Sequence, residues 1–431
     1  MPTITCSIML FRPACLSLVA SYPQPCWQCA IFVAHYANMD VEEILLLAAI
    51  AASVGLYLTM MGGFVTAMWR RSPLPTPSVT PRVSILKPLA GADDELAENL
   101  ASLADLDYPD YEILIGVASV DDPAFMAARR FVAHAGAGKA RLFLTDPDQA
   151  TNPKVAQLLT LERAATGEII LISDSNVRAT PDYLDALVAE LSRPGVAIAS
   201  SIIAGTGEQT LGAALENLQL GAIIAPSVVS AARVLGRPIT VGKSMAMWRS
   251  LLDQIGGLSR VAHLLSEDHM LGNAFAKAGY GVGVSLTPVA NRNVSCSLKR
   301  TLERHTRWAK LRRAIAPVGF WFEPLLSPIV TTTLACLVVP GKTSCVAFLF
   351  ALLLQTGCAF LSMRILRGKS LRWYWAPLEL VRAYLLFFCW TRACLSRRVS
   401  WRGHHFELAR DSAIVPAEPS LLDRVRTLVR A

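Results

Sequence analysis

Long apolar runs near both ends of the chain enclose a middle region in which short apolar segments alternate with amphipathic ones. The first run, 44–69, is almost entirely apolar and uncharged. At 1.5 Å per residue it can cross a bilayer core of about 30 Å, so residues 41–69 are predicted to form a transmembrane helix. Arg70 and Arg71 follow at once, and the positive-inside rule places the chain after them in the cytoplasm. Residues 70–81, with four prolines, are predicted to be a stiff linker.

Residues 82–316 show the alternation of strands and helices that predicts a single α/β domain. The expected strands are 83–86, 111–117, 141–144 and 168–172, and the expected helices run from Asp93 or Asp94 as a cap to 103, from 123 to 134, and over 154–165. A βαβ series of this kind indicates a mostly parallel sheet with helices on both faces. Ligands of such sheets bind beyond the carboxyl ends of the strands, where this chain carries acidic residues.

The second half of the domain is less regular. Helices are expected over 207–228 and 267–278, strands over 240–247 and 281–285, and a basic helix over 297–315. Apolar membrane segments then cover 324–396, where 324–339 and 343–363 could pair as a hairpin. The stretch 373–396 contains Pro377, Glu379 and Arg382 and has basic flanks, so it is expected to be re-entrant or interfacial rather than spanning. Residues 397–431 are predicted to be a cytoplasmic tail.

Residues 1–38 differ from the rest of the chain. They mix cysteine, proline and apolar residues without a clear period, and they lack the basic start and small-residue cleavage site of a signal peptide. Met39 stands just before the long apolar run. Our hypothesis is that Met39 is the native start and that residues 1–38 are a non-native extension.

Composition supports a membrane protein. Of 431 residues, 53% are hydrophobic and 17% are charged, against about 25% charged in an average soluble domain. The net charge of +8 gathers beside apolar runs, as at a cytoplasmic membrane surface, and no nucleic-acid-binding motif occurs. The ten cysteines indicate no disulfide framework, and Cys26 and Cys29 have metal-ligand spacing without a second pair.

The basic helix carries the first candidate chemistry. Helical spacing places Arg304 and Arg307 on one face, with Trp308 one turn after Arg304. Two guanidiniums beside an indole could bind a pyrophosphate, because arginine offers a rigid fork to phosphate oxygens. The alternative is a helix lying on anionic lipid headgroups.

Three acidic residues extend the pattern. Asp122, Asp174 and Asp268 each follow a strand or open a helix, and each alone is better explained as a turn or capping residue. Together with the arginines they suit nucleotide-sugar chemistry. One carboxylate can hold the nucleoside, one a divalent metal on the diphosphate, and one can act as a base.

At this point the chain resembles the ceramide glucosyltransferases of bacterial type, a branch related to glycosyltransferase family 2. The resemblance covers about 83–313 and reappears at Ser400-Trp401-Arg402. The matching stretches are Val83-Ser-Ile-Leu-Lys-Pro-Leu89, Leu106-Asp-Tyr-Pro109, Asp121-Asp-Pro123, Asn152-Pro-Lys154, Asp174-Ser175, Glu267-Asp268 and Arg304-x-x-Arg307-Trp308.

The resemblance implies a GT-A fold, a Rossmann-like domain for nucleotide-diphospho-sugars, and assigns roles within it. It implies that Asp122 lies in the nucleotide pocket, that Asp174 holds Mg²⁺ or Mn²⁺, and that Asp268 is the catalytic base. It implies that Arg304, Arg307 and Trp308 hold the diphosphate and face the acceptor. Lys87 and Lys154 are further candidates for contact with the phosphates or base of the nucleotide sugar, with ordinary surface lysines at strand ends as the alternative. One departure from many relatives is Asn176, which replaces the last carboxylate of an Asp-x-Asp metal motif and can ligate without adding charge.

The implied reaction moves glucose from UDP-glucose to the primary hydroxyl of ceramide by direct displacement with inversion. The partners would be a UDP-sugar, a lipid acceptor and the membrane, with the catalytic domain on the cytoplasmic side of a bacterial inner membrane. One alternative is a glycosyltransferase that transfers N-acetylglucosamine to a hopanoid or another membrane lipid. A processive polysaccharide synthase would need more membrane spans and usually a glutamine in place of Arg304. A non-catalytic membrane scaffold would have no reason to keep the carboxylates and Arg307.

Overall fold

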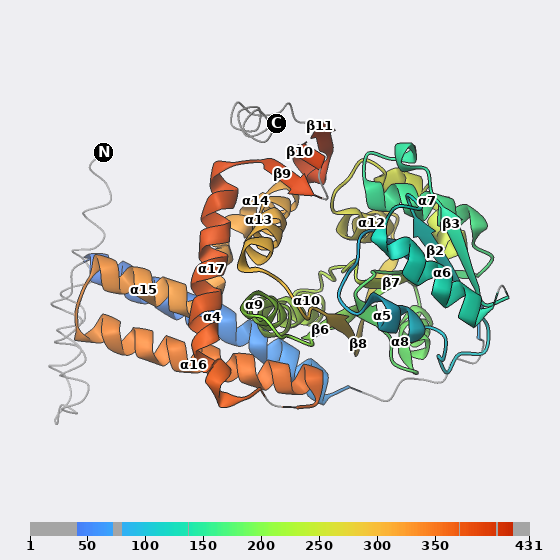
Figure 1. Ribbon diagram of the computed structural model, residues 1–431. Helices are drawn as coiled ribbons and strands as arrows, with labels where there is room; N and C mark the ends of the chain where they lie inside the picture. The colour runs from blue at the N-terminus through green and yellow to red at the C-terminus, as the bar shows by residue number, and fades with distance from the viewer. Residues whose placement is uncertain (1–40, 72–79, 137, 370, 402–403, 417–431) are drawn as a thin grey trace, which may run out of the picture.

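The computed structural model describes residues 41–71, 80–136, 138–369, 371–401 and 404–416 (Figure 1). The hypothesised extension 1–38, most of the expected linker and the end of the expected tail lie outside the described residues.

The α/β domain is built on an eight-stranded sheet with the order β3-β2-β1-β4-β7-β6-β8-β5. Its first half is parallel: β1 (Val83–Leu89) pairs with β2 (Tyr111–Val117) and β4 (Ile169–Ser173), and β2 pairs with β3 (Ala140–Leu144). The helices α5 (Leu96–Ala101), α6 (Pro123–Ala135) and α7 (Pro153–Ala164) connect these strands. These are the strands and helices that the alternation of apolar segments predicts.

The second half of the sheet is mixed rather than parallel. Strand β7 (Ser244–Trp248) runs antiparallel to both β4 and β6 (Val196–Thr206). Strand β8 (Gly281–Arg292) pairs in parallel with β6 and antiparallel with β5 (Val177–Arg178). The expectation of a mostly parallel sheet therefore holds only up to β4. The sequence reasoning missed β6 and helix α8 (Tyr183–Leu191), because both are buried along nearly their whole length and show no alternation.

Two apolar layers hold the sheet between helices. Alternate residues of β1 point to opposite faces: Ile85 packs in the layer under α5, α6 and α8, and Leu86 packs in the layer under α7 and α12 (Glu267–Lys277). Because these strands are fully buried, the polar residues that follow them lie at the carboxyl ends of the strands. Asp174 is such a residue, directly after β4.

The residues expected to cap α5 have another role. The residue at the N-cap is Glu95, whose backbone is left-handed (φ 53°) and whose side chain makes no capping bond. The Asp94 carboxylate instead accepts the backbone N–H groups of Val294 and Ser295 at 2.7 and 2.8 Å. The capping prediction was wrong because this loop is bound to the segment after β8, far away in sequence.

Three helical segments among the described residues are long and apolar enough to cross a membrane: α4 (Val41–Trp69), α16 (Lys342–Arg367) and the continuous segment Leu211–Arg233. Only 22% of the most apolar window is buried in α4 and in α16, against 83% in Leu211–Arg233, which is therefore enclosed by protein. Helix α14 (Pro317–Phe322) and the turn after it meet α15 (Pro328–Val338) at a bend of 76°. The chain is a membrane protein, with α4, α15 and α16 gathered on one side of the eight-stranded sheet (Figure 1).

Helix α17 (Ala376–Leu395) crosses this group and runs to the C-terminal strands (Figure 1). The charged residues noted in its sequence, Glu379 and Arg382, are buried and pair with each other at 2.8 Å. Strands β9 (Arg398–Trp401), β10 (His404–Leu408) and β11 (Ile414–Pro416) then form a separate antiparallel sheet. This sheet touches the segment before α12, since the N–H of Ile414 in β11 donates to the carbonyl of His263 at 2.9 Å.

Candidate functional site

Asp174 occupies the turn directly after β4. Its backbone N–H donates to the carbonyl of Lys243 at 3.0 Å, which fixes the turn against the segment before β7. Its carboxylate forms ion pairs with Lys154 at 2.8 Å and with Lys243 at 3.1 Å. Burial alone raises the pKa of this carboxyl, but the two ammonium groups outweigh burial and hold its pKa well below the usual range. Asp174 is therefore ionised and already neutralised by lysines.

Lys154 joins Asp174 to the start of α12. The Asn152-Pro-Lys sequence opens α7, with Asn152 as the N-cap accepting from the N–H of Lys154 at 2.9 Å and proline in the first turn. The Lys154 ammonium then reaches Glu267 at 2.9 Å as well as Asp174. Burial lowers the pKa of Lys154, but the two carboxylates more than reverse this and raise it above the ordinary value. For the Glu267 carboxyl the effect of burial has the opposite sign, and it is the main cause that raises the pKa of this group.

Asp268 follows Glu267 in the chain but lies in a different environment. It is half-buried, whereas Glu267 is only 7% exposed and bound to Lys154. One carboxylate oxygen of Asp268 accepts the N–H of Gly242 at 2.7 Å, and the other accepts the Ser266 hydroxyl at 3.2 Å and the N–H of His269 at 2.8 Å. These donors orient the carboxylate without a charged partner, an arrangement that suits a general base.

The backbone of Gly242 connects Asp268 with Lys154. Its N–H binds Asp268, and its carbonyl accepts from the Lys154 ammonium at 3.3 Å. A Cβ at this position would stand 2.8 Å from the nearer Asp268 oxygen and 2.9 Å from the Asp268 Cβ, so only glycine allows this approach.

The structure places Lys87 beneath the site rather than in it. The side chain is 0% exposed, and its ammonium donates to the carbonyls of Asp174 and Val177 at 2.5 and 3.5 Å and to the Ser173 hydroxyl at 3.2 Å. Burial lowers its pKa to about 7. Lys87 was expected to contact the nucleotide sugar. Its burial instead favours a positioning role, in which it holds the Asp174 turn from below.

Asp122 caps α6 and binds a neighbouring loop. Its carboxylate accepts the N–H of Ala124 at 2.8 Å and that of Gly91 at 2.9 Å. Asp122 therefore does act as a helix cap, as the alternative explanation from the sequence held. The carboxylate also ties together the loops that follow β1 and β2, at the edge of the sheet where Asp174 lies.

The basic helix is α13 (Leu298–Ile315), and Ser297 caps it. Arg304 forms an ion pair with Glu216 of α9 (Leu211–Gln219), and it lines a small recess together with Asn176, two residues after Asp174. His305 is buried, and burial followed by nearby arginines lowers its pKa to about 3, so it stays neutral. Its ring lies edge-on to Trp308, with ring centres 5.2 Å apart. Arg307 and Trp308 are half-buried on the same helix.

The residues around Asp174 fit a divalent cation on one condition. No group of three or more histidine, cysteine or acidic side chains suited to a metal occurs in the described part of the chain. The Asp174 carboxylate and the Asn176 carbonyl are oxygen ligands of the kind that Mg²⁺ and Mn²⁺ accept, and such cations often combine one or two carboxylates with substrate phosphates. Lys243 now binds both groups, at 3.1 and 3.0 Å. A cation therefore fits only with a diphosphate and with Lys243 displaced.

Three residues of this site were missed by the sequence reasoning: Gly242, Lys243 and Glu216. All three lie far in sequence from the side chains that they contact. Gly242 and Lys243 fall inside the expected strand 240–247, where a glycine and a lysine do not by themselves indicate a site, whereas the observed β7 begins only at Ser244. Nothing in the sequence near Glu216 distinguishes it from other acidic residues of amphipathic helices.

Comparison with known proteins gives consistent results. The profile of glycosyl transferase family 21 matches residues 45–414. Ceramide glucosyltransferase 3 of Caenorhabditis elegans is 26% identical over 392 residues, which is 88% of this chain and 84% of that protein. The ceramide glucosyltransferase of Komagataella phaffii is 25% identical over 476 residues, 87% of this chain and 92% of that protein. The solved mannosyltransferase PcManGT from Pyrobaculum calidifontis, in complex with GDP-Man and Mn²⁺, superposes with a TM-score of 0.47 at 18% identity, covering 78% of this chain and 98% of that one.

Proposed function

Because this chain belongs to glycosyl transferase family 21, and is thus a glycosyltransferase of the ceramide glucosyltransferase family with a GT-A domain and membrane segments, we propose that it transfers glucose from UDP-glucose to the primary hydroxyl of ceramide with inversion. The observation that carries the proposal is the Asp268 carboxylate. It is half-buried, oriented by three hydrogen-bond donors, and adjacent to the Lys154–Asp174 ion pair.

Asp268 acts as the base in this proposal. It accepts the proton of the ceramide hydroxyl, the oxygen forms a bond to the anomeric carbon of glucose, and the bond from that carbon to the UDP oxygen breaks. Glu267 is the less suitable base, because it is buried and its charge is matched by Lys154. Direct displacement needs no covalent intermediate on the enzyme.

The donor side is assigned to the sheet edge and to α13. Asp122 and the loop that it holds would form the nucleotide pocket, and Lys154 and Lys243 would turn from Asp174 toward the diphosphate. Arg304, beside Asn176, and Arg307 with Trp308 would face the leaving UDP. Positive groups directed at the departing diphosphate lower the barrier, because negative charge grows there in the transition state.

A divalent cation belongs to the same proposal. Asp174 and Asn176 would hold it together with the diphosphate, after Lys243 has given way. When bound, such a cation neutralises charge on the leaving diphosphate.

The membrane arrangement is also proposed from the chain itself. Helix 41–69 anchors the protein, 82–316 is the catalytic domain on the cytoplasmic side of a bacterial inner membrane, 324–396 supplies the further membrane segments, and 397–431 is a cytoplasmic tail. The support is Arg70 and Arg71 at the end of α4 and a lipid acceptor that requires a site at the bilayer. A cysteine placed at the exposed Lys277 of α12 should react with impermeant thiol reagents only from the cytoplasmic side.

The test is Asp268→Asn in the purified full chain, with UDP release measured against ceramide. Loss of the base should reduce turnover 10²-fold or more while UDP binding, measured by calorimetry, stays within about threefold. Near-normal turnover would remove Asp268 from the role of base. Glu267→Gln is the matched comparison, because it neutralises the adjacent carboxylate on the same turn.

Acceptor and donor are tested separately on the unmodified protein. Ceramide with UDP-glucose should give the fastest UDP release. Faster release with a hopanoid and UDP-N-acetylglucosamine would replace the proposed substrates but keep the reaction class. No release with any pair would favour a non-catalytic scaffold.

A further inference from the structure

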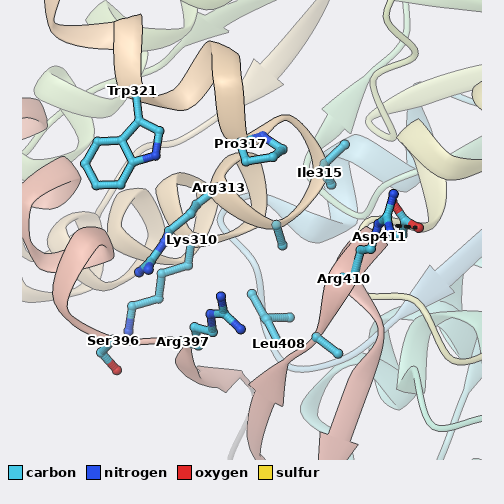
Figure 2. Close-up of a pocket in the computed structure, with 12 residues that line it drawn as sticks. Lys310, Arg313, Ile315, Pro317, Trp321, Ser396, Arg397, Leu408, Arg410 and Asp411 are labelled. Atoms are coloured by element: carbon cyan, nitrogen blue, oxygen red, sulfur yellow. Dashed lines mark ion pairs between the residues drawn. The ribbon is translucent and has the colours of Figure 1, made fainter.

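A cavity of about 500 Å³ lies between the end of α13, helix α14 and the C-terminal sheet. It shares no lining residue with the recess beside Arg304, so it is separate from the proposed donor site. Figure 2 shows the side-chain nitrogens of Lys310, Arg313 and Arg397 in one part of the cavity and the pair Arg410–Asp411 in another.

The cavity is strongly basic. Four cations, those of Lys310, Arg313, Arg397 and Arg410, line it against the single carboxylate of Asp411. Within the described part of the chain, the one ion pair among these residues is Arg410–Asp411, at 4.0 Å and largely exposed. Four positive charges around one cavity attract an anion into it.

Two of these cations are oriented by backbone carbonyls. The Arg313 guanidinium donates to the carbonyls of Ala393 and Cys394 at 2.7 and 2.8 Å, at the end of α17. The Lys310 ammonium donates to the carbonyl of Arg398 at 2.5 Å. Carbonyls fix the direction of a cation but leave its charge uncompensated. Burial, followed by nearby Arg392, lowers the pKa of Lys310, an effect that a bound anion would offset.

The cavity opens beside a helix with an apolar outer face. Val318, Trp321 and Phe322 of α14 are 73%, 55% and 59% exposed, and Trp321 lines the cavity (Figure 2). Helix α14 meets α15 at 76°, and the two together are apolar enough to form one bent membrane segment. A short apolar helix at a steep angle to a second apolar helix, with an exposed tryptophan, is typical of the depth of lipid headgroups.

We propose that this cavity binds the phosphodiester headgroup of an anionic membrane lipid. Arginine forks and a lysine at one end suit phosphate oxygens, and the apolar wall of Ile315, Pro317 and Trp321 suits the glycerol and the first carbons of the acyl chains. The cavity volume lies in the range of small-molecule sites. A zwitterionic lipid would bring its own ammonium group into a cavity that already holds four cations.

The test uses dioctanoyl phosphatidylglycerol as the probe and the full chain in a neutral detergent. Thermal melting followed during titration should show saturable stabilisation by this lipid and at least tenfold weaker apparent affinity for dioctanoyl phosphatidylcholine. Arg397→Glu/Arg410→Glu should weaken phosphatidylglycerol binding at least tenfold. Both residues are exposed, and neither lies in the proposed catalytic site.

The matched control is Arg129→Glu/Arg130→Glu, which makes the same charge change at exposed positions of α6, on the far side of the molecule from α14 (Figure 1). It should bind phosphatidylglycerol as the unmodified protein does. If Arg397→Glu/Arg410→Glu does not fold, Arg397→Gln/Arg410→Gln replaces it. Undiminished binding by the folded double variant, or equal binding of phosphatidylcholine, would overturn the proposal. If inorganic phosphate binds as tightly as phosphatidylglycerol, the cavity is a site for free phosphate and the proposal of a lipid ligand is wrong.

Discussion

Gly242→Ala should slow catalysis by moving the Asp268 carboxylate without replacing any charged residue. The new Cβ would lie 2.8, 2.9 and 3.1 Å from the Oδ2, Cβ and Cγ atoms of Asp268, where ordinary contacts are 3.4–4 Å. Because three atoms of the same side chain are too close, rotation of the carboxylate alone cannot relieve the contact. The first turn of α12 has to move by about 0.6 Å or more, and the hydrogen bond from the Gly242 N–H to Asp268 lengthens.

A displacement near 1 Å at a reacting group costs on the order of 10²-fold in rate, so turnover should fall about 10- to 100-fold. That range corresponds to about 1.4–2.7 kcal/mol of activation free energy. The assay is UDP release in the presence of ceramide, normalised to folded protein, with UDP binding measured alongside. Gly138→Ala is the matched control, since nothing lies within 4 Å of a Cβ at that position. Unchanged turnover in Gly242→Ala would mean that the position of Asp268 does not limit the reaction.

Three further predictions concern Lys87, the divalent cation and Arg307. Lys87 has a pKa of about 7 in the folded protein against 10.5 when unperturbed, so stability should rise with pH between these values, where only the unfolded chain keeps the proton. Lys87→Met should lack this rise in thermal melts at pH 7 and about pH 9, and equal slopes would contradict a buried titrating lysine. Chelation by EDTA should lower UDP release sharply, with rescue by Mg²⁺ or Mn²⁺, whereas full activity in EDTA would assign the leaving-group charge to lysines and arginines alone. Arg307→Lys should lose nearly as much activity as Arg307→Ala, because a point charge does not replace a guanidinium fork, and full activity with lysine would favour a general electrostatic surface.

The elements that the sequence predicted well are those with a local signal. Strands β2, β3 and β4 are short apolar runs bounded by turn residues, and α13 begins at a serine cap and ends before Pro317. The apolar run of α4 exceeds the thickness of a bilayer core. In each case the free energy that decides the structure comes from the segment itself, through burial of one apolar stretch or satisfaction of one helix end, so one sequence suffices to recognise it.

Candidate residues could be identified from the sequence, but not their partners. Asp122, Asp174 and Asp268 were singled out by position and resemblance, whereas the pairing of Asp174 with Lys154 and Lys243 depends on three segments that meet at one sheet edge. The antiparallel strand β7 brings Lys243 and Gly242 there, and no pattern in the sequence marked its direction. Lys87 shows the same limit, since a lysine in an apolar strand can face solvent or the interior.

The sequence by itself therefore determined the membrane anchoring, the α/β character of the domain and which side chains are candidates for chemistry. Only the tertiary structure decided which of them are paired, buried or exposed. The physical reason is that electrostatic and steric environments fall off over a few ångströms and are set by neighbours in space. Glu267 and Asp268 are adjacent in the chain, yet one is buried against Lys154 and the other is only partly buried beside Gly242.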